Sequence, residues 1–217
     1  MRRFFRLKFL VWAMNIFRSL AFDLRFILFE RLKLRASADS YAKHRSRLLY
    51  PDYLKFGAAL EAVRPLAGKY CRGRGLDVGA GRWPLAGSRA IEDAADENAY
   101  VLKESDESLD YVFSSHTLEH LERPWDAIGE WSRVLRHRGV LFMYLPHPAC
   151  EMWNPKYLPF HRWCPDPVVL ETRLSQEFGY EIIYITYLPD AFFSFVVVAQ
   201  KNRPDQRRPS ATEVRKN

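Results

Sequence analysis

The feature that most constrains the fold of this 217-residue sequence is an apolar run ending in closely spaced glycines, Gly75-Leu76-Asp77-Val78-Gly79-Ala80-Gly81. Such a run predicts a buried strand followed by a sharp turn, because glycine freely adopts the backbone conformations that turns require. Glycines at the carboxyl end of a strand also let the backbone approach a bulky ligand. Strand-like and helix-like segments alternate from here to residue 200, which predicts an α/β fold with a doubly wound, mostly parallel sheet.

Four regions are expected along the chain: a basic amphipathic helix (1–35), a helical lead-in (36–70), the α/β domain (71–200) and a disordered tail (201–217). In the lead-in, Tyr53–Val63 is the clearest helical stretch, and we expect Pro65 to end it. Within the domain, the apolar patterns predict the following strands and helices: strands at Leu109–Ser114 and Val140–Leu145, helices at Trp125–Leu135 (ended by Gly139) and Pro167–Phe178, and a final antiparallel strand pair at Glu181–Thr186 and Phe192–Ala199.

The glycine turn does not fit the common phosphate-binding motifs. Pro84 stands where the dinucleotide-binding fingerprint needs its third glycine, and no GK[ST] sequence follows. Asp77, two residues before Gly79, suits a ligand that carries a cationic ammonium group. The acids Glu92 and Asp93 follow the next apolar segment, where a carboxylate can accept both ribose hydroxyls of an adenosine. Glu92 is the first choice, and the alternative Asp93 stays open.

A longer motif runs from Ser114-Ser115-His116-Thr117-Leu118-Glu119-His120-Leu121 through Pro124-Trp125 and Glu130 to Arg133-Val134-Leu135, Arg138-Gly139 and Leu145-Pro146-His147. Together with the glycine turn, this string resembles the class I S-adenosylmethionine-dependent methyltransferases. It is most similar to a sub-group with the pattern SSHxLEHL, which is associated with small-molecule and cell-surface glycan methylation. The resemblance covers residues 73–148 well and 149–199 loosely.

The resemblance implies a Rossmann-like fold and S-adenosylmethionine as the cofactor. It also implies a set of residues around that cofactor: Asp77, Gly79, Ala80, Gly81, Glu92 or Asp93, the backbone near Leu102, and Ser114 to His116. The sequence departs from the family pattern in two places. Only ten residues separate Gly81 from Glu92, so the first crossover must be truncated, and one glycine replaces the usual pair at Gly139.

Methyl transfer to a hydroxyl is helped by a general base, and histidine is the residue type most often used. Three histidines follow predicted strands at the same edge of the sheet: His120, the first choice, with His116 and His147. We expect a small-molecule acceptor that is methylated on a hydroxyl, either of a glycan or of a lipid-linked substrate. We expect no bound metal.

Two other functions remain open. His116 to His120 also fits the HxxEH pattern of zinc hydrolases, but Pro124 leaves room for little more than one turn, and no third ligand is evident. The truncated crossover is in turn compatible with a degenerate methyltransferase fold that binds a partner without catalysis.

Charge separates the ends of the chain from its centre. Residues 1–35 hold nine Lys/Arg against two acids, whereas residues 36–200 have a net negative balance, so nucleic acid is not an expected partner. The N-terminal helix either contacts an anionic membrane surface or docks on its own domain or a second subunit. Three widely spaced cysteines fit a reducing cytoplasm, with a peripheral position at the inner membrane as the alternative. The oligomeric state is not predicted.

Overall fold

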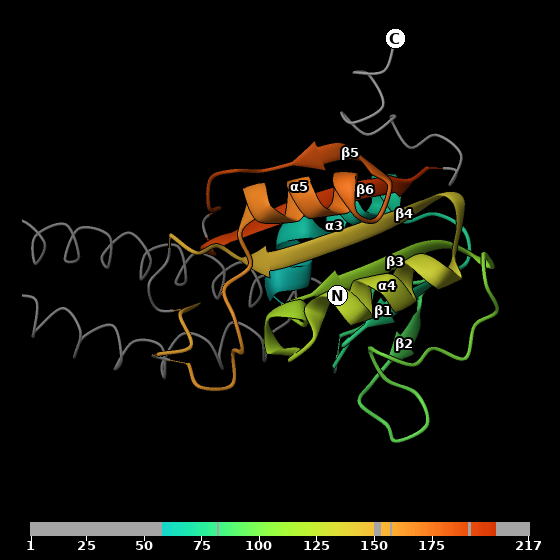
Figure 1. Ribbon diagram of the computed structural model, residues 1–217, viewed down its shortest axis with the longest axis horizontal. Helices are drawn as coiled ribbons and strands as arrows, with labels where there is room; N and C mark the ends of the chain where they lie inside the picture. The colour runs from blue at the N-terminus through green and yellow to red at the C-terminus, as the bar shows by residue number, and fades with distance from the viewer. Residues whose placement is uncertain (1–57, 82, 150–152, 157, 191, 203–217) are drawn as a thin grey trace, which may run out of the picture.

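The computed structural model describes residues 58–81, 83–149, 153–156, 158–190 and 192–202. Six strands form one sheet in the order β2-β1-β3-β4-β6-β5 (Figure 1). Their bounds are Gly75–Val78 (β1), Arg89–Ile91 (β2), Leu109–Ser115 (β3), Leu135–Pro146 (β4), Tyr180–Ile185 (β5) and Ser194–Lys201 (β6). The strands β2, β1, β3 and β4 are parallel, while β6 pairs antiparallel with both β4 and β5. This arrangement confirms the predicted mostly parallel sheet with its antiparallel C-terminal pair.

Helices cover both faces of the sheet. The helices α4 (Pro124–Val134) and α5 (Pro167–Gln176) lie on one face, and α3 (Ala58–Tyr70) lies on the other (Figure 1). On the first face, the fully buried Trp131 and Leu170 pack with strand residues such as Val112. On the second face, Val63 of α3 packs with residues such as Phe113, so neighbouring residues of one strand serve opposite layers of the core.

Two expected helix ends are wrong. Pro65 lies inside α3, whose buried residues Val63 and Ala67 flank it and hold the helix against the sheet despite the lost backbone donor. The helix predicted to run to Leu135 ends at Val134 without help from Gly139. The fully buried Leu135 instead adopts an extended conformation and begins β4, because it pairs with Leu109 of β3.

The connections around β2 are the unusual part of this fold. Neither the β1–β2 connection (79–88) nor the β2–β3 connection (92–108) contains a helix among the residues described, which confirms the truncated first crossover. Ion pairs hold β2 to the second connection, since the guanidinium of Arg89 pairs with Glu97 and Glu104.

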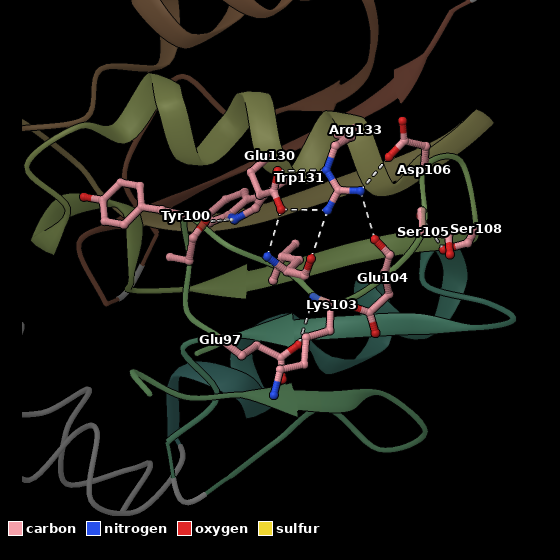
Figure 2. Close-up of polar contacts among 12 residues, drawn as sticks. Glu97, Tyr100, Lys103, Glu104, Ser105, Asp106, Ser108, Glu130, Trp131 and Arg133 are labelled. Atoms are coloured by element: carbon pink, nitrogen blue, oxygen red, sulfur yellow. Dashed lines mark hydrogen bonds and ion pairs between the residues drawn. The ribbon is translucent and has the colours of Figure 1, made fainter. Parts of the chain in front are cut away.

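Side chains of helix α4 also bind the β2–β3 connection and hold it in place (Figure 2). The Arg133 guanidinium donates to the carbonyl oxygens of Leu102 and Glu104 and pairs with Asp106 at 2.6 Å and Glu130 at 2.7 Å. The indole of Trp131 donates to the carbonyl of Ala99 at 3.0 Å. These bonds give a helix-free segment a fixed path beside the sheet.

Several predictions fall outside the described residues. They are the basic amphipathic helix (1–35), the part of the lead-in before Ala58, and the tail from residue 203 onward. Their structure, and the proposed contact of residues 1–35 with a membrane surface, therefore stay predictions. Within the residues described, no helix is both long enough and apolar enough to cross a bilayer.

Candidate functional site

The sheet order places a ligand-binding position between β1 and β3. The chain passes from β1 outward to β2 and then returns to β3 on the other side of β1, so the winding direction reverses at this pair. In open α/β sheets, ligands bind beyond the carboxyl ends of the strands at such a switch point. Val78 at the end of β1 is level with Ser114 of β3, and the hydroxyls of Ser114 and Thr117 each donate to the carbonyl of Val78 at 3.1 Å. The two predicted cofactor segments, 77–81 and 114–116, are therefore neighbours.

The glycine turn is shaped by contact on one side and open space on the other. Gly79 has a φ of +75°, and a Cβ there would lie 2.1 Å from Oγ1 of Thr117. Gly81 has a φ of +55°, but a Cβ there would meet nothing within 4 Å. With Ala80 half-buried between them, the turn leaves open space at Gly81, and a ligand has room to approach the backbone there.

Asp77 lies beneath this turn and is 2% exposed. Its Oδ2 accepts a hydrogen bond of 2.7 Å from the backbone N–H of Leu85, which folds the β1–β2 connection over the strand end. Burial raises the pKa of Asp77 to about 7, the Leu85 bond opposes this shift, and the negative charge of Glu92 adds to it. A cationic group bound nearby would favour the charged carboxylate, as the sequence analysis expects of a ligand with an ammonium group.

The predicted ribose acids follow β2 directly, whereas the backbone of Leu102 is engaged within the protein. Glu92 and Asp93 are exposed, and the negative charge of Glu92 helps to raise the pKa of Asp77. The backbone N–H of Leu102 instead donates to Glu130, and its carbonyl accepts from Arg133. Both backbone groups of Leu102 are therefore used within the protein.

Beyond β3, the chain forms a histidine cluster that consists of His116, Glu119, His120 and His161. Leu118–His120 is a single 3-10 turn (η1), and Glu119 on it is fully buried. Oε1 of Glu119 lies 3.2 Å from Nδ1 of His116 and 3.8 Å from Nε2 of His120. His161 joins from the loop after β4, with its ring centroid 4.8 Å from that of His120.

The members of the cluster differ in exposure and charge. The His116 ring is buried and its Nε2 lies 3.1 Å from Oγ of Ser194, whereas the His120 side chain is 29% exposed. Burial would raise the pKa of Glu119, but the contact with His116 and the neighbouring histidines outweigh it and hold that pKa below its usual value. Burial lowers the pKa of His161 to about 4, so this ring is neutral at physiological pH.

His147, the third predicted base, is not brought into the cluster. Its Nε2 donates to the carbonyl of Tyr187 at 2.9 Å, and its Nδ1 accepts from the N–H of Ala149 at 3.0 Å. Both ring nitrogens thus bind backbone, which indicates a structural role. Glu119 is not among the site residues predicted from the sequence, although the HxxEH spacing was a signal for this carboxylate.

A groove of about 430 Å³ borders the cluster. It is lined by Leu121, Glu122, Arg123, Pro124, Trp125, Asp126, Arg162 and Trp163. The loop residues of the groove are tied to η1, since the N–H of Arg162 donates to the carbonyl of Glu119 and the indole of Trp163 donates to that of Leu118. Trp163 therefore lines a surface hollow, whereas Trp153 of the same connection is buried.

Comparison with known proteins agrees with this geometry. Residues 55–143 match a family model described as a methyltransferase domain. A solved S-adenosylmethionine-dependent methyltransferase from Archaeoglobus fulgidus is similar at 17% identity and a TM-score of 0.53, with 70% of this chain and 99% of that chain covered. One from Thermotoga maritima is similar at 16% identity and a TM-score of 0.50, with coverages of 75% and 99%.

A further similar structure is a Haloferax volcanii complex between the methyltransferase activator Trm112 and a methyltransferase. It shows 12% identity, a TM-score of 0.53, and coverage of 76% of this chain and 97% of that chain. No curated protein matches the sequence. Residues 55–143 thus match a methyltransferase-domain model, and the described part of the chain has the fold of the S-adenosylmethionine-dependent methyltransferases.

Proposed function

We propose that this chain methylates a hydroxyl oxygen of a small-molecule acceptor, which is a glycan or a lipid-linked substrate. The observation that carries the proposal is the pair formed by the half-exposed His120 and the buried Glu119, beside the carboxyl end of β3. A neutral amine attacks through its lone pair and loses its proton afterwards, whereas a hydroxyl is a weak nucleophile until its proton leaves. An oxygen acceptor therefore benefits from a base that is itself oriented by a third group.

His120 is the proposed base because its ring nitrogens have separate tasks. Its Nδ1 lies 3.1 Å from the carbonyl of Phe160, and since a carbonyl only accepts, this nitrogen carries the proton. Nε2 is then the atom that takes a proton from the acceptor, and the Glu119 carboxylate 3.8 Å away stabilises the resulting imidazolium.

The cofactor is proposed to bind across the switch point, with its sulfonium supplying an electrophilic methyl group. The residues present fit such a group: Gly81 leaves open space, Asp77 offers a buried acid to an ammonium group, and Glu92 offers an exposed carboxylate to the ribose hydroxyls. The protein then has to align donor and acceptor and exclude water. The groove beside η1 has the size of a small-molecule site and is proposed to hold the acceptor.

Calorimetry with S-adenosylhomocysteine, the demethylated cofactor, tests the first half of this proposal. We expect saturable binding to the full chain. The absence of binding at millimolar concentration would instead favour the alternative of a methyltransferase fold that has lost catalysis.

Transfer of a radiolabelled methyl group from S-adenosylmethionine to panels of hydroxyl and amine acceptors tests the second half. We expect label in hydroxyl compounds and a loss of about 100-fold in turnover for His120→Gln. The matched control His137→Gln removes an imidazole that lies on β4, outside the cluster, and is expected to leave turnover unchanged. Unchanged turnover in the His120 variant would remove this residue from the role of base.

A further inference from the structure

The ring nitrogens of His120 and His161 are arranged alike. Nδ1 of His161 donates to the carbonyl of Trp153 at 2.7 Å, just as Nδ1 of His120 donates to that of Phe160 at 3.1 Å. Because carbonyls only accept, each Nδ1 is protonated, and in each neutral ring the lone pair lies on Nε2. Histidines that bind metals show this same pattern, in which the second ring nitrogen donates to a backbone carbonyl and fixes the orientation of the ring.

The carboxyl group of Glu119 lies beside the Nε2 atoms of His120 and His161. Its side chain is 0% exposed, and its Oε1 lies 3.2 Å from Nδ1 of His116 and 3.8 Å from Nε2 of His120. A buried carboxylate oxygen beside two imidazole nitrogens offers a divalent cation one anionic ligand and two neutral ones.

We propose that Glu119, His120 and His161 bind one divalent transition-metal ion. Their candidate ligand atoms lie within 4.8 Å of one another. Ligands about 2.0–2.2 Å from a tetrahedral zinc lie about 3.4 Å apart, so the ion would draw the three side chains together by roughly 1 Å. Two histidines and one glutamate form the ligand set of catalytic zinc sites, which keep a fourth position open, and the partial exposure of His120 provides that opening. Imidazole ligands favour zinc and its neighbours over magnesium.

This site differs from the zinc hydrolase pattern considered from the sequence. There, His116 and His120 would both be ligands on one helix, with Glu119 as the base. In the structure the segment is one 3-10 turn, and His116 places its Nε2 against Ser194 and its Nδ1 against the carboxylate. His116 is therefore a positioning residue that orients the glutamate ligand.

The metal proposal stands apart from the proposed methyl transfer, because it requires only the cluster. In the metal-bound protein, His120 is a ligand rather than a base. An acceptor hydroxyl bound at the open position would then lose its proton more readily through the charge of the ion. Addition of Zn²⁺ to the chelator-treated enzyme separates these two roles of His120, since only the ligand role predicts a change in turnover.

The direct test is calorimetric titration of ZnCl₂ into the full chain after chelator treatment and removal of any affinity tag. We expect one ion per chain, no heat with MgCl₂, and zinc counted by mass spectrometry at the same stoichiometry. His161→Gln and Glu119→Gln should each weaken zinc binding about tenfold or more, whereas His137→Gln should change it by less than about twofold.

Glu119 and His161 are buried, so each variant is first checked for native circular dichroism. The half-exposed His120→Gln serves if either of the others fails to fold, and it carries the same expected loss of affinity. The proposal is overturned if the wild-type chain takes up no zinc, or if zinc binds equally well to every folded cluster variant. Neither result depends on whether S-adenosylhomocysteine binds, so failure of this proposal and failure of the proposed methyl transfer are distinguishable.

Discussion

Substitution of Gly79 by alanine tests the packing of the glycine turn that follows β1. A Cβ at this position would lie 2.1 Å from Oγ1, 2.5 Å from Cγ2 and 2.9 Å from Cβ of Thr117, so rotation of the threonine does not relieve the overlap. The positive φ of +75° costs alanine roughly 1–2 kcal/mol, and overpacking of this kind typically costs about 1–3 kcal/mol more. We therefore expect the free energy of unfolding to fall by about 2–5 kcal/mol.

The matched control is Gly81→Ala, which shares the positive φ but meets nothing within 4 Å. It should cost only the conformational part, about 1–2 kcal/mol. Urea unfolding of both variants measures the difference, and calorimetry with S-adenosylhomocysteine shows whether the displaced turn also weakens the cofactor. If the two variants are equally stable, contact with Thr117 does not explain the glycine at position 79, and the reasoning fails.

Three further predictions concern residues around the same edge. The folded-state pKa of Asp77 is raised from 3.8 to about 7, so its contribution to stability is fully present below about pH 4 and is lost as the pH rises towards 7. Wild-type stability relative to Asp77→Asn should therefore fall by roughly 2–3 kcal/mol between pH 5 and pH 8, as measured by urea unfolding at both pH values. Arg133→Ala should lower the free energy of unfolding by about 2–3 kcal/mol, because carbonyl and carboxylate acceptors of the β2–β3 connection lose their donor; a change below 0.5 kcal/mol, roughly that of a surface substitution, would contradict this. Glu92→Gln should weaken S-adenosylhomocysteine binding about tenfold, whereas Asp93→Asn should leave it nearly unchanged, and the reverse order in calorimetry would exchange the two assignments.

The parts of the fold predicted from the sequence were those whose signal is local. The buried strand before Gly79 and the antiparallel C-terminal pair follow from short apolar runs with turn residues between them. The end of α4 was missed because the pairing of Leu135 with Leu109 is a contact between distant residues, and a helical pattern continues through position 135.

The candidate site also combines residues with a local sequence signal and residues that only the fold brings together. The glycine turn and the acids after β2 have recognisable spacing, so the sequence alone suffices to propose them as cofactor residues. The partnership of Glu119 with His161 depends on a loop that returns across 42 residues, and no spacing rule connects the two. His147 was selected because it follows a strand, yet the backbone groups that engage both of its ring nitrogens are apparent only in three dimensions.

The helix-free connections around β2 have a consequence for how the protein responds to ionic strength. The short edge strand β2, which Glu92 follows, pairs with β1 on one side, and the exposed guanidinium of Arg89 ties it to two carboxylates of the β2–β3 connection, where no helix is described. Mobile ions screen such pairs, whereas they leave buried apolar contacts unaffected or strengthened. The β2 edge, where the proposed ribose acid Glu92 lies, should therefore loosen in concentrated sodium chloride while the rest of the sheet stays intact.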